Sequence, residues 1–455
     1  MRLALPRTVP ATPSARGNVL LLFIWLLPFH IVTMAALFGL LGVPAPVVRA
    51  LAAWKESVVL LLMIVIAASG LTGRGPRIIP RPTDLAVGGL GLVAFVYLLG
   101  AQSWFAADLP VGAQVLGWRD AVFFTLVYFV GRATPEVVRD ARYIHALVAV
   151  GVLTSAIAIL ERLLVTPAML VWLGVSHYVQ EYLGLTITTI HNPFGLPDSY
   201  WTGIGDQLVQ RAGSTYLSSQ GFAIPFLVIL PAATLTVLRA ERWRLGAWTA
   251  AAMVWLGLLL TITRMTLVAC AVQVLVLLAL WRRWGVAVGG GLLLTVSLAV
   301  AFLAVPNLAS FALETVTFES ASSVSHLEDW SEGVEHLGEH PLGVGLGAGG
   351  LTGARFGLPP VAADSQYFKY AVELGVLGLG LYLAALAALF GFAARAYRAS
   401  PTPIVRAYAA LVAVTALGIG INGLTTVPLA HPLLAYTFFW IAGALVSAAD
   451  DRGTA

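Results

Sequence analysis

The sequence predicts an all-α polytopic integral membrane protein with about twelve transmembrane helices and two long extracytoplasmic loops. Three observations predict this class. The chain is 59% hydrophobic and 11% charged, whereas soluble domains carry about 25% charged residues. Apolar runs of about twenty residues recur along the chain, and each can cross a hydrocarbon core of about 30 Å. We therefore expect a single transmembrane domain, residues 1–455, and no soluble catalytic domain.

The predicted spans are the apolar runs that lie between turn signals. They cover residues 18–41, 52–72, 84–101, 119–131, 143–163, 217–238, 246–262, 264–281, 286–305, 366–394, 405–424 and 429–448. The first run is too long for the core of a signal peptide and lacks an Ala-x-Ala cleavage pattern, so we expect it to be a retained span. The single cysteine, Cys270, lies inside a span, which excludes an intramolecular disulfide and a cysteine metal site.

Charged residues predict how the chain is threaded through the membrane. Most arginines lie in the connections on one side of the predicted spans, and most acidic residues lie on the other side. This is the positive-inside distribution, which places both termini in the cytoplasm. Because this orientation also explains the formal net charge of +4, the lipid bilayer is the expected partner and no nucleic acid is expected.

Two long connections fall on the outer side, at residues 164–216 and 306–365. Long outer loops on a rigid scaffold often carry binding sites and chemistry. The second loop contains EDWSEGVEHLGEHPLG, which is compatible with a short helix lying on the membrane surface or over a cavity. It also contains His326, His336 and His340 among acidic residues, but no HExxH pattern. A solvated polar loop is therefore favoured over a metal site.

Two arginines are prominent on this otherwise acidic outer side. Arg211 precedes the sixth span in QRAGSTYLSSQG, and Arg264 ends the turn TITR between the seventh and eighth spans. An arginine in so short an outer turn carries a desolvation cost unless it is paired or faces water. Guanidinium groups form forked hydrogen bonds with phosphate, so the two arginines suggest a phosphate site. The alternative for each is an interface arginine that contacts lipid headgroups.

The glycine-rich run HPLGVGLGAGG, residues 340–350, superficially resembles a nucleotide phosphate loop. It lacks the Gly-Lys-Ser/Thr ending and is expected to lie outside, where there is no ATP. A flexible or re-entrant loop whose bare backbone approaches a ligand is the favoured interpretation.

Asp364 precedes the apolar run that begins at residue 366. Aspartate is a good helix N-cap, and capping is one interpretation. The other is a general base at a membrane-proximal cavity, where partial burial would hold its pKa near or above the usual value. Lys55, beside Glu56, enters the second span from outside. A local ion pair or interface anchoring explains it, and lining of a substrate cavity is the alternative.

Four segments occur in a particular order: QRAGSTYLSSQG, TITR at residues 261–264, a long outer loop ending in HPLGVGLG, and DSQYFKYAVELGVLG. By order and sidedness the chain resembles the O-antigen ligase and O-antigen polymerase superfamily of bacterial membrane glycosyltransferases. The resemblance covers residues 205–385 by motif and the whole chain by hydropathy. It implies an undecaprenyl-diphosphate-linked oligosaccharide donor and a glycan acceptor, at the outer face of the bacterial inner membrane. A chain-length regulator is a further expected partner.

By this resemblance, Arg211 and Arg264 would hold the diphosphate and stabilise it as it becomes the leaving group. The stretch from Ala363 to Phe368 matches an Ala-His-Asn-x-Tyr-Leu-like element of the ligases, with Asp364 in place of the histidine that activates the acceptor hydroxyl. Polymerases of repeat units and exopolysaccharides often carry an Asp-Asn/Ser-x-Tyr form. Polymerisation of O-antigen, capsule or exopolysaccharide is therefore favoured over ligation of a finished glycan to lipid A-core or protein.

Asp364 is then the expected catalytic residue. Tyr367, Lys369, His340 and Lys55 are candidates for lining the substrate cavity. No cofactor and no metal are expected, because arginines can perform the task of a cation at the diphosphate.

A transporter of lipid-linked sugars is the alternative from another functional class. Transporters usually keep charged or broken elements near the midplane of several spans. Here most spans are free of charge, and the ionisable groups gather at the outer ends. This distribution favours interfacial chemistry by a membrane glycosyltransferase.

Overall fold

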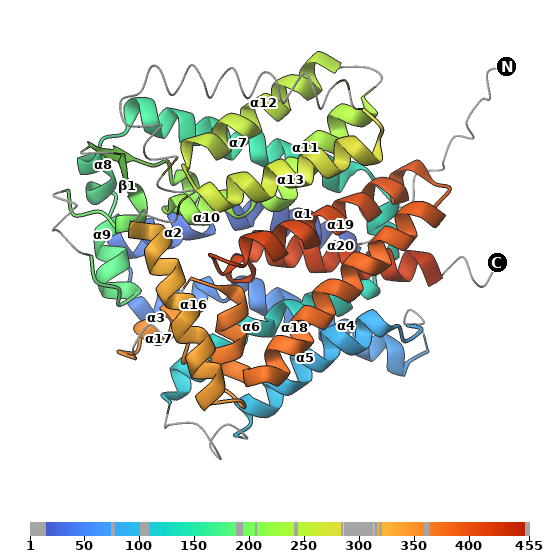
Figure 1. The fold of residues 1–455 in the computed structure, drawn as a ribbon, viewed down its shortest axis with the longest axis horizontal. Helices are drawn as coiled ribbons and strands as arrows, with labels where there is room; N and C mark the ends of the chain where they lie inside the picture. Colours follow the sequence, from blue (N-terminus) through green and yellow to red (C-terminus); the bar gives the residue numbers. More distant parts are fainter. Residues whose placement is uncertain are drawn as a thin grey trace.

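The structure is a computed structural model, and it describes residues 15–73, 78–100, 109–187, 194–204, 207–240, 244–283, 321–358 and 364–450, together with residues 285, 313 and 317. Figure 1 shows long helices packed side by side, with the short elements α8, α9, β1 and α17 gathered at one end of the bundle.

The long helices are α1 (Ala15–Leu26), α4 (Trp54–Leu71), α5 (Pro82–Leu98), α6 (Val111–Arg132), α7 (Arg142–Leu164), α11 (Phe226–Arg239), α12 (Arg244–Leu260), α13 (Arg264–Leu280), α18 (Gln366–Ala399), α19 (Pro403–Asn422) and α20 (Pro432–Asp450). Helices occur at every predicted span that lies within the described residues. Eight helical stretches there are long and apolar enough to cross a membrane, and α5, α12 and α13 are shorter apolar helices. The chain is thus a multi-pass membrane protein. Because the predicted span 286–305 lies outside the described residues, the count of twelve stays a prediction.

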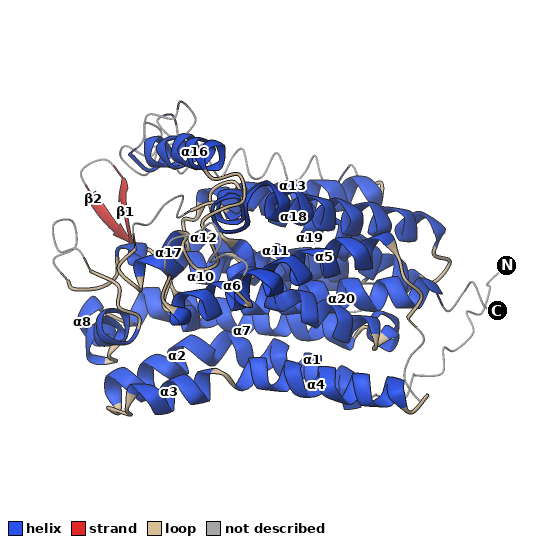
Figure 2. Ribbon diagram, turned by 90° about the horizontal axis from the view of Figure 1, so that it is seen from below, coloured by secondary structure: helices blue, strands red, loops and turns tan. Residues whose placement is uncertain are grey.

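Short elements connect these helices and occupy much of the two predicted outer loops. They are η1 (Leu27–Phe29), α2 (His30–Ala35), η2 (Ala36–Leu40), α3 (Ala45–Ala52), η4 (Pro135–Arg139), α8 (Pro167–Trp172), α9 (Val175–His177), η5 (Tyr178–Tyr182), η6 (Asp198–Tyr200), β1 (Trp201–Ile204), β2 (Gln207–Gln210), η7 (Ser214–Tyr216), α10 (Ser219–Ala223), α16 (Ala321–Glu339), α17 (Gly350–Ala354) and η8 (Pro428–Ala430). Strands β1 and β2 form an antiparallel pair with Trp201 opposite Gln210. Seen from below, α16 lies over one side of the bundle (Figure 2).

The predicted fourth span, 119–131, begins too late. Helix α6 starts at Val111, because the charges that interrupt its apolar run are paired rather than solvated. The Arg119 guanidinium donates two hydrogen bonds to Asp120 Oδ1, at 2.9 and 2.7 Å, and its Nε lies 3.9 Å from Glu56 Oε1 of α4. Hydropathy alone does not reveal such pairing.

Helices α6 and α20 cross at two glycines. A Cβ added to Gly131 would collide with the backbone of Trp440, and one added to Gly443 would collide with the backbone oxygen of Tyr128. Small residues let membrane helices approach closely and pack without relying on the hydrophobic effect. This crossing therefore places α20 deep in the bundle, where 89% of its apolar window is buried.

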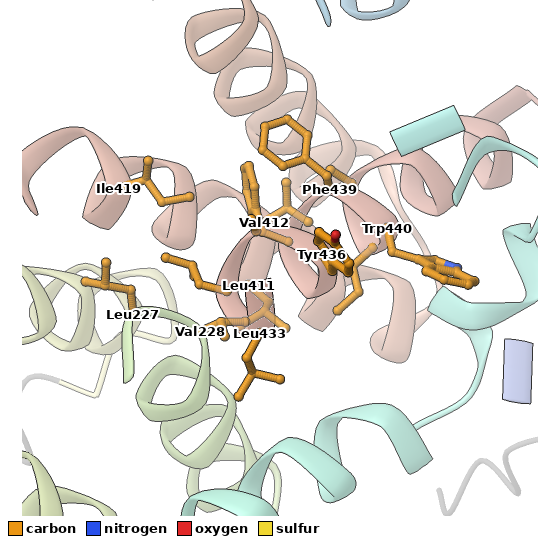
Figure 3. Packing of buried hydrophobic residues seen from close by; sticks show 14 of the residues in the cluster. Leu227, Val228, Leu411, Val412, Ile419, Leu433, Tyr436, Phe439 and Trp440 are labelled. Carbon is orange, nitrogen blue, oxygen red and sulfur yellow. The ribbon is translucent and has the colours of Figure 1, made fainter. Parts of the chain in front are cut away.

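The core is built around α20, α19 and α11. Figure 3 shows Leu227 and Val228 of α11 close to Leu411 of α19 and Leu433 of α20. Trp440 is fully buried in the same cluster. In a bilayer such interdigitated side chains stabilise helix association through van der Waals contact.

Helix α18 is broken near its start, at Gly375, whose φ of 65° and ψ of −160° are not helical. The glycine-rich run 340–350 fills this break. Val344 N donates to the carbonyl oxygen of Val372 at 2.7 Å, and Val376 N donates to that of Pro341 at 2.9 Å. The run therefore folds back against the broken helix, and its approach to a ligand stays a prediction.

Candidate functional site

The candidate site lies at the end of the bundle where α13 and α18 begin and α19 ends. Asn422, the last residue of α19, donates from Nδ2 to Thr266 Oγ1 of α13 at 2.9 Å. The next residue, Gly423, accepts hydrogen bonds from Ser365 Oγ at 3.2 Å and from Gln366 N at 2.9 Å. These bonds join the turn that contains Arg264 to the turn that contains Asp364, two segments that are about a hundred residues apart in sequence.

Arg211 follows β2 and reaches the turn between α12 and α13. Its Nε donates to the carbonyl oxygen of Thr261 at 2.7 Å, and its terminal nitrogen donates to Thr263 Oγ1 at 2.8 Å. Both partners are neutral. Burial, together with the like charge of Arg264, lowers the pKa of Arg211 to about 10. Arg211 is therefore still cationic at neutral pH, and a bound anion would offset the repulsion between the two arginines.

The backbone around Arg211 is fixed by its neighbours. Arg211 N donates to the carbonyl oxygen of Tyr200 at 2.7 Å. The carboxylate of Glu161, at the end of α7, accepts from Gly213 N at 3.3 Å and from Ser214 N at 2.6 Å. A rigid backbone holds the guanidinium in one place, which reduces the entropy lost when it binds a ligand.

Arg264 is the first residue of α13, in a turn where Ile262 has a φ of 51°. Both Arg211 and Arg264 are half-buried at this end of the bundle. Arg162, the residue after Glu161, donates from its guanidinium to Oε1 of Gln210, the residue before Arg211, at 3.4 Å. The structure thus gathers positive charge where two arginines were predicted to bind phosphate.

Asp364 is not the N-cap of α18. The N-cap is Ser365, whose hydroxyl oxygen accepts from Phe368 N at 3.4 Å. Within the described residues, no hydrogen bond or lysine or arginine ion pair engages the Asp364 carboxylate. The capping interpretation is therefore wrong. Its carboxylate is available for chemistry, because Ser365 performs the structural task.

The surroundings of Asp364 come from the amphipathic helix α16. Burial raises the pKa of Asp364, and the charge of His326 lowers it in part. The ligating atoms of His326, Asp329 and Asp364 all lie within 4.8 Å of one another. A carboxyl whose pKa is raised in this way is better able to take a proton from a weak acid.

Helix α16 is held over the start of α18 by two contacts. Trp330 Nε1 donates to the carbonyl oxygen of Leu424 at 2.9 Å. At Gly333 an added Cβ would collide with the ring of Phe368, so the two helices touch there. The expected amphipathic helix in the second outer loop is thus present as α16, and its place on the membrane surface or over a cavity stays a prediction.

Of the other predicted cavity residues, Tyr367 lies three residues after Asp364, whereas His340 lies at the far end of α16 from His326. Tyr367 donates its hydroxyl to the carbonyl oxygen of Gly420 at 2.6 Å, which ties α18 to α19. His340 is exposed just beyond the end of α16, and its ring centroid lies 4.8 Å from that of His336. Contact of Tyr367 and His340 with a substrate stays a prediction.

Lys55 is buried, at 5% exposure, in a polar cluster between α2, α4 and α6. Its ammonium lies 3.2 Å from Glu56 Oε1 and 3.3 Å from His30 Nε2. Glu56 in turn lies near Arg119, which pairs with Asp120. The local ion pair is therefore present, within a larger buried network.

Lys369 belongs to the same buried region from the side of α18. Its ammonium pairs with Glu373 Oε1 at 2.7 Å, and the same oxygen accepts from Gly347 N at 3.2 Å. The charge of Lys369 acts on Asp120, whose Oδ2 accepts from Thr352 Oγ1 at 3.3 Å. Because Lys55, Arg119 and Lys369 each pair with a carboxylate, this cluster is a compensated network, unlike the surroundings of Arg211.

Several polar residues of this end were not singled out from sequence. Arg119, Asp120 and His30 lie within apolar runs, and their mutual contacts depend on the tertiary fold. His326 was considered for a metal site, and a solvated loop was favoured. Its pairing with Asp329 carried a usable signal, since a spacing of three residues puts both on one helix face.

Comparison with known proteins adds one finding. Residues 248–383 match the O-antigen ligase family. The matched segment contains Arg264, His326, Asp329 and Asp364, and Arg211 lies before it. No curated protein matches the chain.

Proposed function

We propose, because residues 248–383 match the O-antigen ligase family, that this chain is a membrane glycosyltransferase that polymerises lipid-linked repeat units of O-antigen, capsule or exopolysaccharide. The donor is an undecaprenyl-diphosphate-linked glycan, and the acceptor is a glycan hydroxyl at the outer face of the bacterial inner membrane. The observation that carries the proposal is the hydrogen-bonded junction that links the turns of Arg264 and Asp364.

Arg211 and Arg264 bind the diphosphate of the donor. Two donor groups of the Arg211 guanidinium are used by Thr261 and Thr263, and a guanidinium has five N–H donors in all. The remaining donors face no carboxylate partner within the described residues. As the bond between the sugar and the diphosphate breaks, the leaving oxygen gains negative charge, which the two cations stabilise without ATP or a metal at the diphosphate.

Asp364 accepts the proton of the attacking hydroxyl. The acceptor oxygen forms a new bond to the anomeric carbon, the bond from that carbon to the diphosphate oxygen breaks, and the proton passes to the Asp364 carboxylate. In an inverting transfer the base lies on the face opposite the leaving group. The raised pKa of Asp364 suits it to this step.

Ligation of a finished glycan to lipid A-core or protein is the second candidate. The family match carries the description O-antigen ligase, which favours it. Aspartate at position 364, where the ligase element has histidine, favours the polymerase. A polymerase would also fit a chain-length regulator as its partner in the membrane.

Asp364→Asn tests the proposal in a strain that lacks the chromosomal gene. The substitution keeps the size of the side chain and removes the base, so we expect transfer to fall by at least about a hundredfold while the protein level in the membrane is unchanged. Glu328→Gln, an exposed carboxylate on α16, is the matched control and should retain transfer. Normal product from Asp364→Asn would refute the role of Asp364.

A further inference from the structure

We propose that His326, Asp329 and Asp364 form a site for one divalent transition-metal cation, Zn²⁺ or Mn²⁺, between α16 and the start of α18. The inference rests on the proposed function, since Asp364 is the general base there and a ligand of the cation here. Each residue offers one ligand atom, and these atoms all lie within 4.8 Å of one another. All three side chains are half-buried, so an ion can enter from solvent.

The arrangement of the three ligands suits a metal. His326 and Asp329 share one face of α16, because they are three residues apart, and the fold brings Asp364 to them from the turn before α18. One imidazole with two carboxylates suits Zn²⁺ or Mn²⁺ better than Ca²⁺ or Mg²⁺, which prefer oxygen ligands alone. Tetrahedral bonds of about 2.1 Å separate ligand atoms by about 3.4 Å. The ligand atoms, now within 4.8 Å of one another, would have to approach by about 1 Å to reach this separation, and side-chain rotation can supply that movement.

A second observation concerns the polar atoms themselves. His326 Nδ1 is buried and has no hydrogen-bond partner among the described residues, and this nitrogen would be a ligand or would orient one. Within the described residues no lysine or arginine forms an ion pair with Asp329 or Asp364. The ligand atoms of Asp329 and Asp364 lie within 4.8 Å of each other, and a divalent cation between them would offset the repulsion between the two carboxylates.

The cation would act at the acceptor end of the site. Three protein ligands leave a coordination position open, as in catalytic rather than structural metal sites. A hydroxyl oxygen bound there becomes a stronger acid, and its proton would pass to the carboxylate oxygen of Asp364 that does not bind the ion. The donor end keeps its arginines, so the two reacting partners would be bound by different cations.

The test is isothermal titration of Zn²⁺ into the full-length protein in detergent micelles, after removal of any affinity tag and of residual metal by chelation. Wild type should bind one Zn²⁺ per chain. His326→Ala and Asp329→Asn should each weaken this binding by more than about tenfold, with the elution profile of the folded protein retained.

Two control variants locate the ion. Glu328→Gln replaces an exposed carboxylate beside Asp329, and His336→Ala removes one of the two histidines at the far end of α16. Both should bind Zn²⁺ as wild type does. Loss of binding in His336→Ala, or equal binding by wild type and His326→Ala, would overturn the proposal. Because the titration contains no glycan, its outcome is separate from that of the polymerase proposal.

Discussion

Replacement of Arg211 by lysine separates the forked hydrogen bonding of this residue from its charge. The guanidinium donates to Thr261 O at 2.7 Å and to Thr263 Oγ1 at 2.8 Å, and its remaining N–H groups can bind the diphosphate. A lysine ammonium keeps the positive charge but cannot form both bonds and still present a fork to phosphate.

The magnitude follows from the bonds that are lost. Each net hydrogen bond contributes about 0.5–1.5 kcal/mol, so the two bonds that orient Arg211 amount to about 1–3 kcal/mol. This corresponds to a reduction of about 5- to 150-fold in the efficiency of transfer. The bonds to the diphosphate itself would add to this loss, since charge-assisted hydrogen bonds are stronger.

The assay is pulse labelling of lipid-linked repeat units in a strain lacking the gene, complemented by each variant at equal membrane level. The Arg211→Lys protein should convert labelled units to polymer about 5- to 150-fold more slowly than wild type. Arg244→Lys, an exposed arginine at the other end of α12, is the matched control and should be neutral. A wild-type rate for Arg211→Lys would refute forked binding by this residue.

Three further predictions follow from the same geometry. Arg264→Lys keeps charge but loses the fork, so transfer should fall by about tenfold or more; near-normal polymer in the complemented strain would count against bidentate binding of diphosphate. The transfer rate should rise with pH through a pKa above about 3.9, the usual value for aspartate, because burial raises the pKa of Asp364. A transfer rate that does not change with pH through this range would contradict the assigned base. Gly443→Leu should destabilise the bundle by about 1–3 kcal/mol, because even a Cβ collides with Tyr128; an unchanged thermal transition in detergent would show that α6 and α20 do not cross there.

Hydropathy was enough to locate the helices, because a membrane span must satisfy its own backbone and expose apolar side chains. It placed the start of α6 eight residues late, since Arg119 and Asp120 neutralise each other within the bundle. Arg132 shows the same limit. It ends α6, where an arginine is expected to face water, but it is 1% exposed and pairs with Asp84 at 2.9 Å.

The residues of the candidate site could be predicted from the sequence, but the hydrogen bonds that bring them together could not. The segments of Arg211, Arg264 and Asp364 could be recognised from their order along the chain. The hydrogen bonds that join them run through Asn422 and Gly423, which carry no local signal. Similarly, the sequence could not decide between Asp364 and Ser365 as the helix cap, because both residue types cap well.

The most direct test of the central claim is a glycan profile of a strain that lacks this gene, with the lipid-linked and surface-attached pools separated by size. The proposed polymerase predicts single repeat units on the lipid carrier and no polymer ladder, with both restored by wild type and not by Asp364→Asn. Full-length polymer stranded on the carrier would contradict polymerisation and indicate a ligase. Normal size distributions in both pools would contradict glycan transfer by this protein altogether.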